Sequence, residues 1–353
     1  MEDQNKNISE SHNSHVDQGL YEHYRIEVDK GQRQLRIDKF LSSKLEAKSR
    51  SKIQNAAKAG NILVHNEVIK PNYKVKPGDI ISIVLAYPPR EVELIPQDIP
   101  IQILYEDDHL VVVNKDADMV VHPGYGNYTG TLVNALVHHF KDLPLQNQEK
   151  VKPGLVHRID KDTSGALVIA KNEFAQTKLA KIFYDRKIDR LYQALVWGDL
   201  KNDSGTITGN IGRSLKNRKV MQVFQDENYG RHAVTHYNVI ERFGYVTLIE
   251  CKLETGRTHQ IRAHLKHLGY PLFNDETYGG DRILKGTTFS KYKQFVNNCF
   301  KICPRQALHA KTLAFQHPVT GNYMSFEAPM PEDMQQLLEK WKQYSVHKYN
   351  QQQ

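Results

Sequence analysis

The short connections between strand-like segments constrain the fold of this chain more than any other feature of its sequence. A parallel pair of strands needs a crossover of about a dozen or more residues, and most of these connections are shorter. Strand-like apolar runs occur at 101–105, 109–114, 155–159, 166–170, 191–197, 219–224, 234–240 and 245–253. Helical runs occur at 131–140, 173–185, 258–268 and 331–343. We therefore expect an α+β domain over 101–345 with a mixed, mainly antiparallel β-sheet.

A smaller unit with a different pattern precedes this domain. The apolar residues of 35–45 lie on one helical stripe, and a second helix is predicted over 50–59 with Ser49 as its N-cap. Two short strands and a third one over 80–84 follow. This order predicts a small α/β domain over 21–85.

The remaining segments are polar or rich in proline. We expect 1–20 to be a disordered tail and 346–353 to be a polar tail. Four prolines spaced through 86–100 indicate a linker between the two domains.

Positive charge is concentrated in the small unit. The chain has 353 residues, with 48 Lys and Arg against 40 Asp and Glu and a net charge of +8. Residues 35–84 alone hold ten basic and four acidic side chains. Such a segment is either a module that binds a polyanion or an ordinary lysine-rich surface.

Cysteine content and hydropathy predict where the protein is found. Three cysteines are too few for a disulfide framework, and we expect Cys299 and Cys303 to be thiols. No apolar run approaches the roughly 18 residues of a membrane span, and the polar N-terminus does not resemble a signal peptide. We expect a cytoplasmic protein with no membrane association.

The densest polar cluster in an apolar context lies within 154–172. If 155–160 is extended, side chains alternate between two faces, so Arg158 and Asp160 emerge together at the strand end. A carboxylate beside a guanidinium there could be a nucleophile or base with a neighbouring cation. It could equally be a structural salt bridge at a hairpin.

Three other chemistries fit this cluster less well. Asp160 and Asp162 are too close in sequence for a typical glycosidase pair, whose members usually come from different elements. A metal site formed by His157, Asp160 and Asp162 with later histidines would be opposed by flanking arginines. A kinase catalytic loop is excluded because the sequence lacks the accompanying kinase motifs. We therefore expect no metal site.

A second cluster lies within 253–272. Thr255 or Thr258 could cap a helix that ends at Gly269. Arg262 falls at the edge of the apolar stripe of this helix, where a cation is costly to bury unless it is paired. Asp160 is the natural partner, and the alternative is that Arg262 extends to water.

The small unit resembles the S4 RNA-binding domain. The similar stretches are Leu35-Arg36-Ile37-Asp38-Lys39-Phe40-Leu41, Ser49-Arg50-Ser51-Lys52-Ile53, Gly60-Asn61-Ile62-Leu63-Val64-His65-Asn66 and Lys76-Pro77-Gly78-Asp79. The resemblance implies that its helices present basic residues to an RNA backbone: Arg36, Lys39, Arg50, Lys52 and Lys58. Such contacts provide affinity for RNA but little specificity for its base sequence.

The rest of the chain resembles the RluA-type pseudouridine synthases. The similar motifs are Gly154-Leu155-Val156-His157-Arg158-Ile159-Asp160-Lys161-Asp162-Thr163-Ser164-Gly165, Arg190-Leu191-Tyr192-Gln193-Ala194-Leu195-Val196 and Leu253-Glu254-Thr255-Gly256-Arg257-Thr258-His259-Gln260-Ile261-Arg262-Ala263-His264. An S4-like domain ahead of them is typical of the RluD branch, which modifies uridines in large-subunit ribosomal RNA. The resemblance spans about 35–345.

This resemblance implies the reaction and the roles of four residues. Asp160 matches the catalytic carboxylate, Arg158 the residue that fills the space of a flipped-out base, and Tyr192 the aromatic that stacks on the uracil. A neighbouring cation favours an ionised carboxylate, so Arg262 is the expected partner of Asp160. No cofactor is implied. The implied partner is 23S-type ribosomal RNA or a precursor of the large subunit, bound by a monomer. A non-catalytic RNA-binding factor for ribosome assembly is the alternative.

Two stretches depart from the family pattern, and one further segment is basic. The departures are 115–118 and Asn274-Asp275, and we expect neither to contact the four residues with implied roles. Residues 281–306 hold six basic side chains against Asp281 alone. We expect either a second RNA contact there or an ordinary exposed loop.

Overall fold

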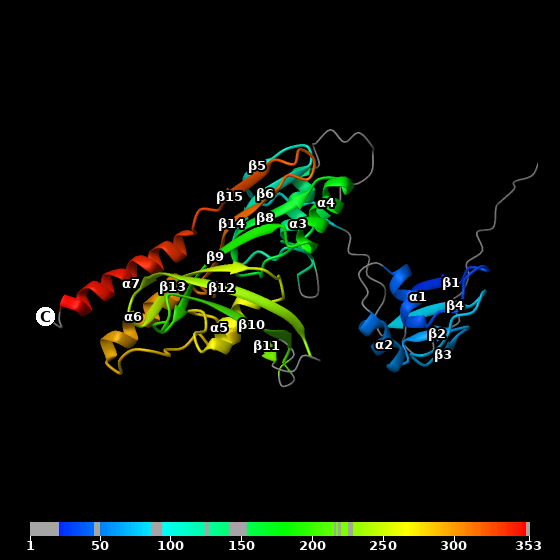
Figure 1. The fold of residues 1–353 in the computed structure, drawn as a ribbon, viewed down its shortest axis with the longest axis horizontal. Helices are drawn as coiled ribbons and strands as arrows, with labels where there is room; N and C mark the ends of the chain where they lie inside the picture. Colours follow the sequence, from blue (N-terminus) through cyan, green and yellow to red (C-terminus); the bar gives the residue numbers. More distant parts are fainter. Residues whose placement is uncertain are drawn as a thin grey trace, which may run out of the picture. The chain divides into compact units, whose positions relative to one another are not determined.

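The computed structural model divides into two compact units, Met1–Val92 and Glu93–Gln353 (Figure 1). It describes residues 21–45, 50–85, 94–123, 127–140, 154–214, 217, 220–224 and 229–350. The predicted tail 1–20, the predicted cap Ser49 and the first part of the predicted linker lie outside the described residues.

The N-terminal unit is a four-stranded antiparallel sheet with two helices. The strand order is β1 (Tyr21–Glu27), β4 (Ile80–Leu85), β2 (Ile62–Val64) and β3 (Glu67–Val68). Helices α1 (Ile37–Lys44) and α2 (Arg50–Lys58) bury Ile37, Phe40 and Ile53 in one core with the sheet. The two predicted helices and the three predicted strands are therefore present, and β1 is an addition.

The C-terminal unit contains a sheet of eleven strands among the described residues. Nine follow the order β11-β10-β12-β13-β9-β14-β8-β6-β5, with β15 paired to β14 and β7 to β8. Every pairing is antiparallel except that of β14 with β8. The predicted α+β class and the mixed, mainly antiparallel sheet are confirmed. The strands are β5 (Gln102–Glu106), β6 (Leu110–Lys115), β7 (Gly154–Leu155), β8 (Ser164–Ala170), β9 (Ile188–Trp197), β10 (Ser204–Arg213), β11 (Met221–Phe224), β12 (Arg231–Arg242), β13 (Val246–Leu253), β14 (Leu308–Gln316) and β15 (Tyr323–Glu327).

The one parallel pairing depends on a glycine. Gly165 has a φ of +119° at the start of β8, and a Cβ there would lie 2.2 Å from the carbonyl oxygen of Ala310 on β14. Only glycine allows this backbone conformation and this approach. The approach brings the segment that precedes β8, which contains Asp160, against the centre of the sheet.

Five helices pack on this sheet: α3 (Leu132–His139), α4 (Glu173–Tyr184), α5 (Gln260–Leu268), α6 (Ser290–Ile302) and α7 (Glu332–Asn350). Helix α5 contributes Ile261 and Leu265 to the main core. Helices α6 and α7 form a second core around Trp197 and Phe273. Helix α7 continues to Asn350, past the predicted domain end at 345.

Two predictions about elements are wrong, and three strands of the large sheet were not predicted at all. The predicted strand over 155–159 ends at Leu155. The predicted exposed loop over 281–306 contains α6, which buries Tyr292, Val296 and Cys299. Strands β10, β14 and β15 were not predicted. β10 contains three glycines and few apolar residues, so its pattern is weak.

Candidate active site

A cleft of about 750 Å³ opens beside the central strands of the large sheet. Its walls come from the segment that precedes β8, the end of α4, the start of β9 and the turn between β13 and α5. The cleft therefore brings together parts of all three sequence motifs, including Arg158, Asp160, Tyr192 and Arg262.

Arg262 on α5 holds two carboxylates in this cleft. Its Nη1 lies 3.0 Å from Oδ2 of Asp160, and its Nε and Nη2 lie 2.8 and 2.9 Å from the two carboxylate oxygens of Asp275. The side chain of Arg262 is 6% exposed, that of Asp275 is 0% and that of Asp160 is 19%. The alternative in which Arg262 extends to water is therefore excluded.

Charge pairing keeps Arg262 protonated. Burial alone would lower the pKa of Arg262, but the hydrogen bonds and charges of Asp275 and Asp160 outweigh it and raise the pKa above its ordinary value. The expectation that Asn274-Asp275 does not touch the predicted residues is wrong. Asp275 contacts Arg262 directly because a bidentate carboxylate satisfies the buried guanidinium.

His259 faces Asp160 from the other side. Its Nε2 lies 3.8 Å from Oδ1 of Asp160, and its Nδ1 lies 3.1 Å from the hydroxyl of Tyr278. Burial lowers the pKa of His259, although Asp160 opposes this. A neutral imidazole with its Nε2–H directed toward Asp160 fits both contacts.

The predicted threonine cap of α5 is wrong. His259 occupies the N-cap position with a left-handed φ of 53° and no side-chain cap. The hydroxyl of Thr255 instead donates to Oε1 of the buried Gln260 at 2.7 Å. Gln260 in turn donates to the carbonyl oxygen of Val234, so the turn before α5 is anchored to β12.

Tyr192 and Arg158 line the same cleft with different exposure. Tyr192 lies on β9 and is 8% exposed, and burial raises its pKa, so it remains a neutral phenol. Arg158 is exposed. The predicted strand alternation does not place Arg158 and Asp160, because the strand ends at Leu155 and the segment after it is irregular.

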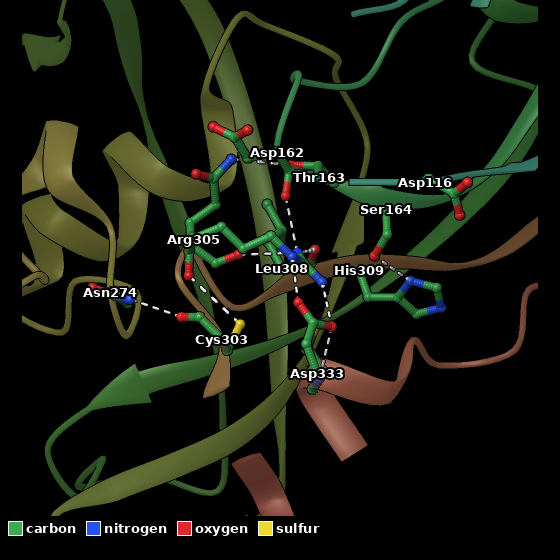
Figure 2. A network of polar contacts seen from close by, with 12 residues as sticks. Asp116, Asp162, Thr163, Ser164, Asn274, Cys303, Arg305, Leu308, His309 and Asp333 are labelled. Atoms are coloured by element: carbon green, nitrogen blue, oxygen red, sulfur yellow. Dashed lines mark hydrogen bonds and ion pairs between the residues drawn. The ribbon is translucent and has the colours of Figure 1, made fainter. Parts of the chain in front are cut away.

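Two buried cations hold the turn of residues 160–163, which we call the Asp160 turn. Inside it, the amide of Thr163 donates to the carbonyl oxygen of Asp160 at 3.1 Å. Lys115 Nζ donates to the carbonyl oxygen of Lys161 at 2.8 Å, and Arg305 Nη1 donates to that of Asp162 at 2.9 Å. Figure 2 shows Arg305 between this turn and Asp333.

Arg305 and Lys115 both lie where we did not expect them from the sequence. Arg305 belongs to the segment predicted as an exposed basic surface, but it is 7% exposed and makes a bidentate pair with Asp333 at 2.7 and 2.9 Å. Lys115 belongs to the divergent stretch 115–118, and burial lowers its pKa to about 7. Sequence alone gave no sign of either contact, because each joins elements distant along the chain.

In the N-terminal unit, the five residues expected to bind RNA are all exposed on or beside α1 and α2. Two of them also have a structural role. Arg50 and Arg36 donate to the carboxylate of the buried Asp38 at 3.0 and 3.2 Å. Asp38 therefore fixes the position of two of these cations.

Metal and membrane features are absent from the part of the chain that the structure describes. No group of three or more His, Cys, Asp or Glu residues there is placed to hold a metal ion. None of the helices described has the length and hydropathy of a transmembrane span. The three cysteines are buried free thiols.

Comparison with known proteins identifies the family. A family model described as RNA pseudouridylate synthase matches residues 109–267, and one described as S4 domain matches residues 35–81. An uncharacterized RNA pseudouridine synthase of Chlorobaculum parvum is 50% identical over 317 residues, covering 89% of this chain and 96% of that protein. The chain belongs to the RNA pseudouridine synthase family.

Further relatives agree with this assignment. Ribosomal large subunit pseudouridine synthase D of Xanthomonas campestris is 43% identical over 304 residues, covering 86% of this chain and 88% of that protein. The solved structure of human RNA Pseudouridylate Synthase Domain Containing 4 shares the fold, with a TM-score of 0.52 and 22% identity over 68% of this chain and 93% of that one. The predicted family and S4 domain are confirmed, and the protein is an RNA pseudouridine synthase, which is an isomerase.

Proposed function

We propose that this synthase isomerises specific uridines of large-subunit ribosomal RNA, with Asp160 as the catalytic carboxylate. The observation that carries the proposal is the pairing of Asp160 with Arg262 in the wall of an open cleft. The pairing supplies a carboxylate that is fixed, next to a permanent cation and still 19% exposed to a substrate. Relatives named ribosomal large subunit pseudouridine synthase D support the choice of RNA.

The reaction needs one carboxylate and no electron transfer. The N1–C1′ bond of uridine breaks, the base turns and a C5–C1′ bond forms. C5 then loses its hydrogen as a proton and N1 takes up a proton, so the product is an isomer of uridine. Asp160 starts this sequence by attacking the sugar or the base, or by removing a C2′ proton. Either role requires the carboxylate form, and Arg262 donates one hydrogen bond to it at 3.0 Å.

The target base must leave its helix before it reaches Asp160. Arg158 is exposed at the cleft, where it can enter the space that the base leaves. Tyr192 presents an aromatic surface in the same cleft, on which the uracil stacks for about 1–3 kcal/mol. We propose that the enzyme acts as a monomer.

RNA affinity comes largely from the S4 domain in this proposal. Arg36, Lys39, Arg50, Lys52 and Lys58 are exposed there and contact phosphates. Ribosomal RNA as the substrate implies that the enzyme works in the cytoplasm.

Release of tritium from RNA that contains 5-tritiated uridine tests the activity. Isomerisation exchanges the hydrogen at C5, whereas a protein that only binds RNA does not. We expect the purified protein to release tritium from an unmodified large-subunit transcript. Absence of release from a folded protein that binds this RNA would favour the alternative of an assembly factor.

A further inference from the structure

One buried cation in the cleft lacks a partner. Arg190 lies on β9, two residues before Tyr192, and is only 9% exposed. Its Nε is buried without a hydrogen-bond acceptor. Arg190 makes no ion pair with any residue that the structure describes, in contrast to Arg262 and Arg305, which both hold carboxylates.

Two uncharged aromatic rings lie beside Arg190. Its guanidinium carbon lies 5.8 Å from the ring centre of Phe183 on α4. That ring stacks on His157 with 4.5 Å between ring centres. Burial, with a smaller effect of Arg190, lowers the pKa of His157 to about 3, so the imidazole is neutral at pH 7. The ring face of Phe183 gives a cation–π attraction, but neither ring supplies a negative charge to Arg190.

Gly256 provides the space in which the guanidinium lies. A Cβ on Gly256 would be 2.7 Å from Nη1 of Arg190. Gly256 belongs to the turn before α5, and both residues line the cleft. Any other residue at this position would displace the Arg190 head from its place in the cleft wall.

Two further arginines line the same cleft. Arg186 and Arg257 line the cleft together with Arg190, and the charges of Arg231 and Arg186 add to burial in lowering the pKa of Arg257. The acids of the cleft are already occupied, since Asp160 pairs with Arg262 and Glu254 contacts His236 at 2.7 Å. This wall is therefore positive and lacks internal compensation.

We propose that Arg190, supported by Arg186 and Arg257, binds a backbone phosphate of the RNA strand next to the flipped uridine. A buried charge without a partner destabilises the free protein, and a ligand anion removes this cost. The guanidinium fork matches a phosphate, which is present at every nucleotide that enters the cleft. The inference rests on the proposed function and assigns Arg190 to positioning of the substrate.

The test compares three variants of the full-length protein. Arg190→Met removes the charge, Arg190→Lys keeps it without the fork, and Lys178→Met removes an exposed charge of α4 that is not part of the cleft. Affinity for an unmodified large-subunit transcript is measured as a function of salt. Tritium release on the same RNA gives kcat and KM.

We expect Arg190→Met to weaken RNA binding about tenfold and to reduce the slope of log K against log salt by about 0.7. KM should rise more than kcat falls. Arg190→Lys should keep the slope and lose part of the affinity, and Lys178→Met should match the wild type. The melting temperature of Arg190→Met should not fall, because the variant loses an unpaired buried charge.

Two results would overturn the assignment. One is wild-type affinity and slope in Arg190→Met. The other is a fall in melting temperature that accompanies the loss of binding, which would mean a structural role.

If Arg190→Met does not fold, the exposed Arg186→Met must show the reduced slope instead, and an unchanged slope rejects the site. A wild-type protein that binds RNA but releases no tritium would contradict the proposed function, whereas the binding slopes would still decide the role of Arg190.

Discussion

At the scale of single residues, Arg262 fixes the positions of two carboxylates in the candidate active site, because it donates hydrogen bonds to Asp160 and Asp275 at once. The bidentate pair with Asp275 fixes the guanidinium plane, and the remaining N–H group is directed at Asp160. We therefore expect Asp275 to act through Arg262 as a positioning residue for Asp160, the proposed catalytic carboxylate.

Replacement of Asp160 tests the catalytic role most simply. Asp160→Asn has nearly the same shape but provides neither a nucleophile nor a base, so we expect it to abolish tritium release. Folding and RNA affinity should remain close to wild type. The measurements are tritium release, RNA binding and thermal melting on one preparation. Activity above about 1% of the wild type would remove Asp160 from the catalytic role.

Replacement of Arg262 tests the ion pair. Arg262→Ala leaves Asp275 buried without its partner, and loss of one member of a buried pair costs about 3–5 kcal/mol. We expect a large drop in the single-turnover rate and in the melting temperature. Lys266→Ala removes the same charge from an exposed position on α5 and serves as the control. Equal effects of the two substitutions would contradict the pairing.

Buried histidines predict a loss of stability in acid. Burial lowers the pKa of His309 and of His264 to about 4, from an ordinary value of 6.5. Between pH 6.5 and 4 the unfolded chain binds protons that the folded protein does not, so the free energy of unfolding falls as the pH falls. Above pH 6.5 these groups contribute no pH dependence.

The prediction is checked by melting curves between pH 7.5 and 4.5. His309→Asn should show a smaller fall in melting temperature over this range than the wild type. His122→Asn, at an exposed position, should follow the wild type. An unchanged pH dependence in His309→Asn would show that this residue is not neutral in the folded state.

At the scale of elements, α7 acts on the active site through Arg305. The helix supplies Asp333, which fixes Arg305, and Arg305 holds the carbonyl oxygen of Asp162 in the Asp160 turn. Lys115 at the end of β6 holds the adjacent carbonyl. The position of Asp160, the proposed catalytic carboxylate, therefore depends on β6 and α7, neither of which lines the cleft.

Loosening this anchor should lower the rate without changing RNA affinity. Asp333→Asn weakens the bidentate pair with Arg305, and we expect a drop of about tenfold in the single-turnover rate, the effect of about 1.4 kcal/mol. Glu332→Gln changes the neighbouring charge on α7, which is not paired with Arg305, and is the matched control. Equal rates for the two variants would show that the anchor does not influence the turn.

Local sequence patterns predicted many of the helices and strands. They could not predict contacts between residues that are distant along the chain. The stripe of α5 and the apolar run of β8 were recognisable because their spacing is regular. The weak pattern of β10 and the basic composition around α6 concealed a strand and a buried helix. Asp160 and Arg262 could be linked from their motifs. The contacts of three other residues could not be predicted, because nothing near these residues in the sequence shows which distant group they contact: Asp275, Lys115 and Arg305.

At the scale of the whole molecule, we predict that one unit provides most of the RNA affinity and the other carries out the reaction. The five exposed cations proposed for the S4 domain lie in Met1–Val92, whereas the phosphate site proposed around Arg190 and every residue proposed for the reaction lie in Glu93–Gln353, which has its own cores. Each phosphate contact contributes about 0.7–0.9 to the slope of log K against log salt. The S4 domain should therefore supply affinity and the larger unit the rate.

Removal of residues 1–92 tests this division. We expect weaker RNA binding, a flatter salt dependence and a single-turnover rate within a few-fold of the full-length protein at saturating RNA. Thermal melting shows whether the truncated protein is folded. A folded, saturated protein whose rate is reduced more than about tenfold would mean that the S4 domain takes part in forming the active site.

The central claim is that Asp160 of this protein converts uridines of large-subunit ribosomal RNA. The most direct test is to map pseudouridines at single-nucleotide resolution in that RNA, isolated from a strain that lacks the gene and from the same strain expressing the wild-type protein or Asp160→Asn. We predict that specific pseudouridines disappear in the deletion, return with the wild-type protein and do not return with Asp160→Asn. An unchanged map in the deletion, or restoration by Asp160→Asn, would contradict the account.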